Sequence, residues 1–304
     1  MRVAIIGSGP AGFYAAEALL KRTDIRFDVD VFDRLPTPYG LVRGGVAPDH
    51  QKIKSVARVF AATAARPSFR FLGNVRLGRD LSVDDLRRHY DHIVYATGNE
   101  GDRRLGIPGE GIDGCTPASV FVGWYNGHPD YRNARFDLSV PRVAVVGNGN
   151  VALDVARILT RSRAELEKTD VAAHALEALC RSAVREVFVL GRRGPAQAAF
   201  TPGELEELGE MEEADPVVDP ADLPAADGEE KGNLALLRAY AARSPRPGAR
   251  RIHLRFLTSP VEIRPGASGR VGSIVLERNR LETRPDGSVA AHGTGETQVL
   301  DVGL

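Results

Sequence analysis

Cysteine and long apolar runs are scarce in this chain of 304 residues, and each scarcity excludes a class of protein. Its two cysteines, Cys115 and Cys180, are far apart and form no C-x-x-C pair, which excludes a redox disulfide motif and a zinc ribbon. No apolar run approaches the roughly 20 residues that cross a membrane. Met1 leads directly into a predicted strand, without the layout of a signal peptide. We therefore expect a cytoplasmic protein with no membrane span and with both thiols reduced.

The chain also lacks a surplus of charge of either sign. Lys+Arg and Asp+Glu both number 40, so the formal net charge is zero. Binding to nucleic acid needs an excess of positive charge, and we therefore expect no nucleic-acid partner. A hydrophobic share of 43% and a charged share of 26% are typical of a globular protein. The length predicts about two domains.

What the sequence does contain is a strand, a glycine turn and a helix at its start. Residues 3–6 have the unbroken apolar pattern of a buried parallel strand, and residues 13–20 that of an amphipathic helix. Between them, Gly7, Gly9 and Gly12 have the spacing G-x-G-x-x-G. The first glycine permits a tight turn, the second lets the backbone approach a pyrophosphate, and the third lets helix and strand pack closely. The N–H groups at the helix start then hold the negative charge.

The next strand supports a dinucleotide site rather than the alternative, in which the glycines serve packing alone. This strand, at residues 27–32, ends in Asp33, about 20 residues past the last glycine, where an acid binds a ribose hydroxyl. Beyond Asp33 the sequence predicts, in order, a rigid loop at 34–50, a helix at 51–65, a strand at 69–77, a helix that starts at Ser82, and a buried strand at 91–98.

A second unit of the same kind begins at Pro141. A strand at 142–147 is followed by Gly147-Asn-Gly-Asn-Val-Ala152 and by a helix at 153–160. The next strand, at 186–190, ends in Gly191-Arg192-Arg193 instead of an acid. Adjacent guanidinium groups match a 2′-phosphate with charge-assisted bonds, whereas a carboxylate would repel it. The second unit is therefore predicted to hold NADP rather than NAD; the alternative is a solvated arginine pair.

The remainder predicts one further helix and then strands. Thr201 and Glu204 have the spacing of a capping box, with Thr201 as N-cap and Glu204 reaching back to it. The helix should bury Leu205, Leu208 and Met211 and leave its glutamates in solvent. The sequence then predicts a loop at 216–232, strands at 252–256 and 271–276, a turn at 285–287, and the start of another strand at 298.

These motifs together resemble the adrenodoxin-reductase-like ferredoxin–NADP+ reductases, a family of FAD enzymes. Four segments carry the resemblance: residues 7–14, 39–50, 147–157 and 191–197. It implies an α/β fold with two Rossmann-like three-layer dinucleotide-binding domains, of FAD type over 1–101 and of NADP type over 102–297, with a return to the FAD domain starting at 298–304. The family's returning part carries a Gly-Trp…Gly-Pro-x-Gly segment that does not occur here. We therefore expect an FAD domain that is incomplete at its C-terminus, in a fragment or a naturally shortened protein.

The resemblance also implies the site residues. His50 and Glu207 correspond to a His–Glu pair that lies near the nicotinamide in the family. The alternative is that His50 only anchors its loop and that Glu207 is only a surface carboxylate. His89 and His92 are spaced like metal ligands but have no apparent third partner, so no metal site is expected. For Arg103, an implied NADP contact, the alternative is that it only covers the protein surface beside Arg104. The implied contacts are Ala11, Asp33, Leu41 and Val75 for FAD, and Arg103, Asn148, Gly149, Asn150, Val151, Arg192, Arg193 and Glu204 for NADP.

The function that the resemblance implies is hydride transfer from NADPH to FAD, followed by single-electron transfer to a ferredoxin-type iron–sulfur protein. Two other kinds of two-nucleotide flavoprotein are disfavoured. Thioredoxin-reductase-like enzymes need a C-x-x-C pair, and the small subunits of glutamate synthase usually carry a cysteine-rich segment; neither occurs here. The alternative of a different class is a non-catalytic NADP-binding module without flavin turnover.

Overall fold

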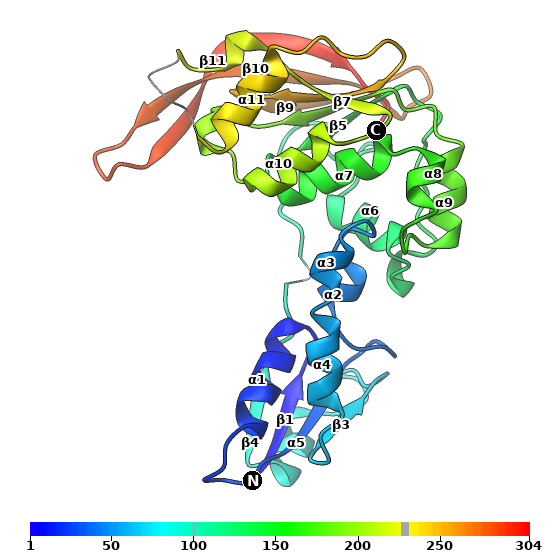
Figure 1. The fold of residues 1–304 in the computed structure, drawn as a ribbon, viewed down its shortest axis with the longest axis vertical. Helices are drawn as coiled ribbons and strands as arrows, with labels where there is room; N and C mark the ends of the chain where they lie inside the picture. The colour runs from blue at the N-terminus through cyan, green and yellow to red at the C-terminus, as the bar shows by residue number, and fades with distance from the viewer. Residues whose placement is uncertain (100, 226–230) are drawn as a thin grey trace. The chain divides into compact units, whose positions relative to one another are not determined.

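The computed structural model describes residues 1–99, 101–225 and 231–304. The chain divides into two compact units, Met1–Asp102 and Arg103–Leu304 (Figure 1). Each unit is built on its own parallel sheet, so the predicted α/β fold with two Rossmann-like sheets is confirmed. Within the described part of the chain, no helix is both long and apolar enough to span a membrane.

The first unit contains a four-stranded sheet in the order β3-β2-β1-β4, with every neighbouring pair parallel. The carboxyl ends of the strands meet at one edge, since Ile6 pairs with both Phe32 and Tyr95. This edge is where the glycine turn begins. The strands are β1 (Arg2–Ile6), β2 (Asp28–Phe32), β3 (Phe69–Leu72) and β4 (His92–Tyr95).

Both faces of this sheet are covered by helices, because alternate residues of each strand point to opposite sides. Val3 and Ile5 pack with Phe13 of α1 (Pro10–Leu20) and Phe60 of α4 (Ala57–Ala64). Ala4 and Ile6 face the other way, toward Leu86 of α5 (Val83–His89). The unit therefore has three layers. Ser82 caps α5 in a capping box with Asp85, as the sequence predicts.

Four sequence expectations for the first unit need correction. The predicted helix at 51–65 is two helices, α3 (Gln51–Lys54) and α4, because the hydroxyl of Ser55 donates to the carbonyl of Lys52 and the intervening hydrogen bonds are of the i→i−3 type. The strand predicted at 69–77 ends at Leu72, before Asn74, whose φ of 58° turns the chain. The strand predicted at 91–98 is shorter and lies at the sheet edge, which leaves Tyr95 59% exposed. A short helix, α2 (Leu41–Gly44), also lies within the predicted loop.

The second unit has a parallel sheet in the order β5-β6-β8-β7. Its strands are β5 (Arg142–Val146), β6 (Glu186–Leu190), β7 (Ala214–Val218) and β8 (Arg250–Arg255). The sequence did not predict β7, which runs into the expected loop at 216–232. The described part of that loop also contains a short 3-10 helix, η3 (Pro220–Asp222), and residues 226–230 lie outside the described residues.

The two faces of the second sheet are covered differently. One face packs against helices α6 (Ala118–Tyr125), α7 (Asn150–Thr160), α10 (Pro202–Gly209) and α11 (Asn233–Ala241). The other face, which includes Phe188 and Leu190, packs against an antiparallel sheet that contributes Ile263, Ile274 and Leu276. The third layer is thus a sheet in the order β11-β10-β9. Its strands are β9 (Thr258–Pro265), β10 (Val271–Thr283) and β11 (Val289–Asp301).

The end of the chain lies along the outer edge of β5. Gly303 donates its N–H to the carbonyl of Arg142, and Leu304 accepts from the N–H of Ala144. Residues 298–301 are the last part of β11, and the predicted return of 298–304 toward the first domain stays a prediction. The elements not yet named are η1 (Pro129–Tyr131), α8 (Arg163–Leu166), α9 (Ala173–Cys180) and η2 (Pro195–Gln197).

Candidate dinucleotide-binding sites

The first glycine turn (residues 7–12) joins β1 to α1, and at two of its three glycines there is no space for a Cβ atom. Gly7 has a φ of 108°, and a Cβ there would overlap the carbonyl of Ala96. A Cβ at Gly12 would overlap the carbonyl of Gly7. At Gly9, in contrast, the nearest atom to a Cβ would be the Cα of Gly40 at 4.0 Å. Two of the glycines are thus required by packing, and the middle one leaves open space at the helix start, as a pyrophosphate site requires.

Asp33 holds this turn against the end of β2. Its carboxylate accepts hydrogen bonds from the N–H of Ser8 (2.8 Å), the hydroxyl of Ser8 (2.5 Å) and the N–H of Leu35 (2.9 Å). A carboxylate offers about four acceptor positions. The three bonds therefore leave capacity for one more donor, such as a ribose hydroxyl, and the ribose contact of Asp33 stays a prediction.

A second loop of the first unit lies directly against the glycine turn. Tyr39, whose φ is 91°, donates its N–H to the carbonyl of Ser8 at 2.9 Å. A Cβ on Gly40 would come within 2.8 Å of the Cα of Gly9, so only glycine allows this close approach. The loop presents Leu41, which is 68% exposed, at the start of α2.

The other site residues that the resemblance implies in the first unit are Ala11, Val75 and His50. Ala11 is exposed in the first turn of α1, and Val75 donates its N–H to the carbonyl of Asp33 at 2.9 Å. His50 is the N-cap residue of α3, but its side chain does not cap that helix. Capping therefore does not explain the histidine, and its role stays a prediction.

The second glycine turn (residues 147–152) borders a cavity of about 400 Å³. At Gly147, whose φ is 133°, an added Cβ would meet nothing within 4 Å, and at Gly149 the nearest atom to a Cβ would be the Cβ of Ala199 at 3.9 Å. A Cβ on Gly191 would instead collide with the side chain of Asn148. We call the cavity of about 400 Å³ beside this turn the turn cavity. It is lined by Leu105, 146–149, 190–193, Gln197, Ala199 and 258–260.

The turn cavity brings together four of the eight expected NADP residues, namely Asn148, Gly149, Arg192 and Arg193. Arg192 and Arg193 line it just past the end of β6, the strand next to β5, from which the glycine turn starts. Arg103 is exposed and does not line it, although Leu105 does, and the role of Arg103 stays a prediction. Val151 is 53% exposed in the first turn of α7.

Gln197 also lines the turn cavity, although the sequence pattern alone predicts no role for it. Its Oε1 atom is buried and has no hydrogen-bond partner among the described residues. A buried acceptor without a donor is costly, and a ligand donor would relieve it. The residue lies inside one of the four motif segments (191–197), so the signal was present in the sequence.

The cap of α10 differs from the capping box expected there. Thr201 accepts a hydrogen bond from the N–H of Glu204 (3.4 Å), as predicted. Its own N–H, however, donates to the side-chain oxygen of Asn150 (2.9 Å), which ties α10 to the second glycine turn. The carboxylate of Glu204 lies 3.5 Å from the guanidinium of Arg157 instead of reaching back. The reciprocal bond of the capping box was therefore wrongly predicted.

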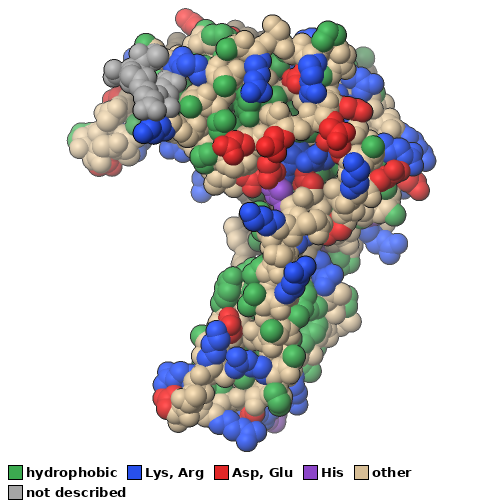
Figure 2. Space-filling model, viewed as in Figure 1, with side chains coloured by type: hydrophobic (Ala, Val, Ile, Leu, Met, Phe, Trp, Pro, Cys, Tyr) green, Lys and Arg blue, Asp and Glu red, His purple; other side chains and the backbone are tan. Residues whose placement is uncertain are grey.

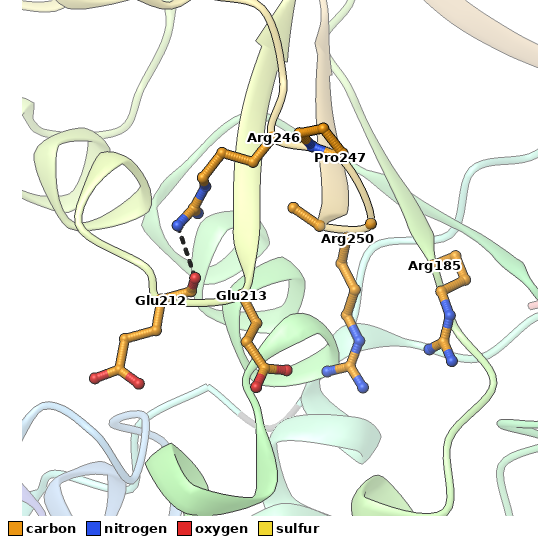
Figure 3. A pocket seen from close by; sticks show the side chains of 8 residues that line it. Arg185, Glu212, Glu213, Arg246, Pro247 and Arg250 are labelled. Carbon is orange, nitrogen blue, oxygen red and sulfur yellow. Dashed lines mark hydrogen bonds between the residues drawn. The ribbon is translucent and has the colours of Figure 1, made fainter.

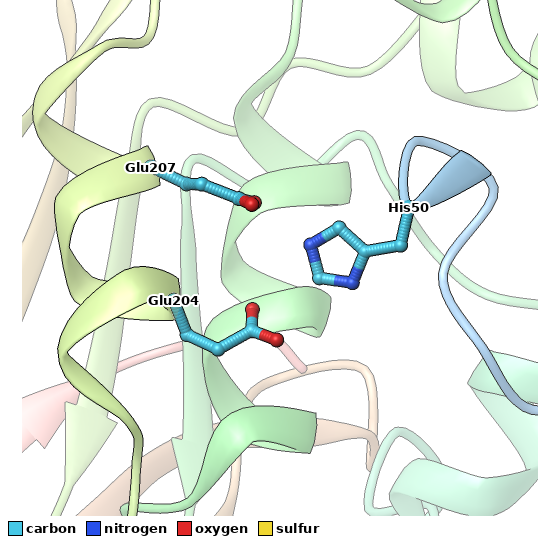
Figure 4. A group of neighbouring side chains, drawn as sticks. All are labelled: His50, Glu204 and Glu207. Carbon is cyan, nitrogen blue, oxygen red and sulfur yellow. The ribbon is translucent and has the colours of Figure 1, made fainter. Parts of the chain in front are cut away.

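Arg157 joins α7 to the acidic side of α10. Its guanidinium is fully buried and lies 2.7 Å from Asp154, 3.5 Å from Glu204 and 3.5 Å from Glu207. Figure 4 shows the carboxylates of Glu204 and Glu207 projecting from the same side of α10, and it also labels His50 of the first unit. Neither glutamate is fully exposed, which corrects the expectation that the glutamates of α10 are simply solvated.

The remaining glutamates of this segment do lie in solvent. Glu206 and Glu210 are exposed, as are Glu212 and Glu213. Figure 2 shows acidic side chains gathered over α10 on the face in view. The apolar side of the helix is as predicted, since Leu205, Leu208 and Met211 are all buried.

A second depression, of about 440 Å³, lies at the opposite edge of the second sheet (Figure 3). Its arginines are engaged in the fold: Arg250 donates to the carbonyls of Thr160 and Arg161, and Arg246 donates to the carbonyl of Glu212. Burial lowers the pKa of Arg250, and the nearby Arg185 lowers it further. In open α/β sheets ligands bind at the carboxyl ends of the strands, whereas this depression borders the amino ends of β6 and β8.

Comparison with known proteins agrees with this geometry. Residues 1–188 match the family model described as pyridine nucleotide-disulphide oxidoreductase, which gives the broad class of the chain. Within that class, the chain is 49% identical to NADPH-ferredoxin reductase FprA of Mycobacterium tuberculosis, over 99% of this chain and 68% of that protein. It is 43% identical to the mitochondrial NADPH:adrenodoxin oxidoreductase of Arabidopsis thaliana, over 100% of this chain and 66% of that protein.

A solved structure gives the same result. The structure of M. tuberculosis FprA in complex with NADPH matches with a TM-score of 0.96 and 48% identity, over 100% of this chain and 69% of that one. The chain therefore belongs to the adrenodoxin-reductase-like family of ferredoxin–NADP+ reductases, and it is shorter than the relatives it matches. The resemblance stated from the motifs is confirmed.

Proposed function

We propose that this protein is an NADPH-dependent flavoprotein reductase that passes electrons from NADPH, through FAD, to a ferredoxin-type iron–sulfur protein. The observation that carries the proposal is the turn cavity, which Arg192 and Arg193 line together with the second glycine turn at the carboxyl end of a parallel sheet. Two cationic side chains and a glycine-lined helix start match the two phosphorylated parts of NADPH.

The residues of the first unit fit FAD. Gly9 leaves open space beside the uncapped start of α1, and Asp33 retains one acceptor position beside that turn. FAD, when bound, supplies the acceptance of a hydride and the release of electrons one at a time. The protein's part is to hold the nucleotides: α1 and Asp33 bind the first, and α7 with Arg192 and Arg193 bind the second.

A visible spectrum of the purified chain, followed by addition of NADPH, tests the proposal. A flavin band that bleaches with NADPH, together with reduction of an added ferredoxin, would support the reductase. A colourless protein that binds NADPH would instead support the second candidate, a non-catalytic NADP-binding module. That candidate requires only the turn cavity, which the second unit forms with its own residues.

Replacement of Arg192 or Arg193 by alanine is expected to weaken NADPH binding selectively. A hydrogen bond to a charged group contributes about 1.5–3 kcal/mol, so each variant should raise the dissociation constant for NADPH by about 10- to 100-fold. Binding of NADH, which lacks the 2′-phosphate, should barely change. Calorimetric titration with both nucleotides measures the effect, and an equal loss for both would show that the pair serves folding.

We also assign His50 and Glu207 to the nicotinamide end of the coenzyme, where they orient the ring or handle a proton. His50→Ala is then expected to slow flavin reduction by NADPH, by about 10²-fold if the histidine takes part in proton transfer. Stopped-flow absorbance measures this rate. An unchanged rate would remove the pair from the mechanism.

A further inference from the structure

The arginine loop (residues 191–193) is held by hydrogen bonds to its main chain. Gly191 donates its N–H to the carbonyl of Arg255 (2.8 Å) and accepts from the N–H of Thr258 (3.0 Å). The carbonyl of Arg193 accepts from the N–H of Leu257 (3.0 Å). These three bonds join main-chain groups at the end of β8 and the start of β9, so no side-chain substitution removes them directly.

The carbonyl of the middle residue, Arg192, is held by a side chain instead. Asn279 of β10 donates from Nδ2 to this carbonyl (2.8 Å) and to the hydroxyl of Ser259 (2.7 Å). The carbonyl can only accept, which fixes the orientation of the amide. Asn279 is 5% exposed, and its own N–H donates to the carbonyl of Leu257 (2.7 Å), so the side chain has little freedom to move.

An irregularity of the antiparallel sheet lies at this same point. The pairing of β10 with β11 shifts between Glu277 and Asn279. Opposite this shift, Thr294 donates its hydroxyl to the carbonyl of Arg278 (2.9 Å). The third layer of the unit thus reaches the arginine loop in two ways: through the main chain of Thr258 in β9 and through the buried side-chain amide of Asn279 in β10. Other bonds stabilise the irregular pairing itself.

We propose that Asn279 is a positioning residue that sets the preference for the phosphorylated coenzyme. By fixing the carbonyl of Arg192, it fixes the backbone from which the guanidinium reaches the turn cavity. Bidentate binding of a phosphate depends on this orientation, because two parallel bonds must form at once. The second glycine turn joins β5 to α7 and is held by other bonds, such as those from the N–H of Gly147 to the carbonyl of Leu190 (2.9 Å) and from the N–H of Thr201 to Asn150 (2.9 Å). Pyrophosphate binding therefore does not depend on Asn279. The assignment rests on the proposed function of the turn cavity.

Titration of the full chain with 2′,5′-ADP and with 5′-AMP tests this role. The first probe carries the 2′-phosphate and the second lacks it. Asn279→Ala is expected to reduce the preference for 2′,5′-ADP by about tenfold, as loss of one hydrogen bond that orients a charged contact implies. The isosteric Asn279→Asp should reduce it at least as much, because a carboxylate cannot donate to the carbonyl of Arg192. Binding of 5′-AMP should stay within about twofold of the wild-type value.

The matched control is Thr294→Ala, which removes a hydrogen bond of the same irregular pairing without touching the arginine loop. It should leave the preference unchanged. If the wild-type chain shows no preference for 2′,5′-ADP, the proposed function fails. If the wild type shows the preference and both Asn279 variants keep it, the positioning role alone is overturned. Failure of both variants to fold would also overturn it, since Asn279 would then be required by the fold rather than by the coenzyme site.

Discussion

Replacement of Arg157 by methionine is expected to destabilise the second unit by about 3–5 kcal/mol, because removal of one partner from a buried ion pair leaves buried charge without compensation. The guanidinium is fully buried, and the side chains of Asp154 and Glu204 are only 12% and 11% exposed. In the variant, the carboxylates of Asp154 and Glu204 would lose the guanidinium of Arg157 while they remain in the protein interior, where water solvates them poorly. Glu207 is 43% exposed, so its loss adds little.

Trp124 makes this prediction measurable in the second unit alone. It is the only tryptophan of the chain and is 4% exposed in the core of that unit. Urea unfolding followed by tryptophan fluorescence should show a lower midpoint with little change in slope. The matched control is Arg163→Met, since Arg163 pairs with Glu167 at 2.7 Å but is 72% exposed, and this variant should leave the midpoint nearly unchanged because solvent screens the pair. Equal midpoints for the two variants would contradict the role of Arg157.

Replacement of Gly12 by alanine is expected to disrupt the first unit by about 4 kcal/mol or more, which is the range of severe steric mutations. Helix propensity alone predicts the opposite sign, because alanine is about 1 kcal/mol better than glycine within a helix. The added Cβ would overlap the carbonyl of Gly7, however, and both groups belong to the backbone. Helix α1 would have to move away from β1, which also opens the first glycine turn.

Hydrogen exchange measured by mass spectrometry on peptides of β1 and α1 tests this outcome without any bound nucleotide. Faster exchange is expected in Gly12→Ala throughout residues 2–20. Gly203 provides the matched control: it lies in the first turn of α10, and a Cβ there would meet nothing within 4 Å. Gly203→Ala should leave exchange in α10 unchanged or slower. Protection of α1 that survives in Gly12→Ala would show that the turn can adjust.

Both strand–turn–helix units could be predicted from the sequence because their determinants are local. The apolar run, the glycine spacing and the helix that follows lie within about 20 residues of one another, and each serves the same structure. The Arg192–Arg193 pair was predictable for the same reason, since it directly follows β6. The structure places that pair beside the second glycine turn, in the turn cavity.

Features that depend on distant partners could not be predicted in this way. Strand β7 contains Pro216 and has an acidic neighbourhood, which argued for a loop; as an edge strand it tolerates a proline. The outer parts of β10 and β11 are exposed and show no apolar pattern. Asn279 looks like any polar residue in such a strand, and only its bond to a carbonyl 87 residues away gives it a role.

The antiparallel third layer also has a consequence for synthesis on the ribosome. Phe188 and Leu190 emerge long before Ile263, Ile274 and Leu276, the residues that cover them. During that interval one face of the nascent parallel sheet is apolar and open to water, a condition that favours aggregation or chaperone binding. Arg192 is likewise made well before the Asn279 amide that bonds to its carbonyl, so the arginine loop acquires this bond only after β10 has been made.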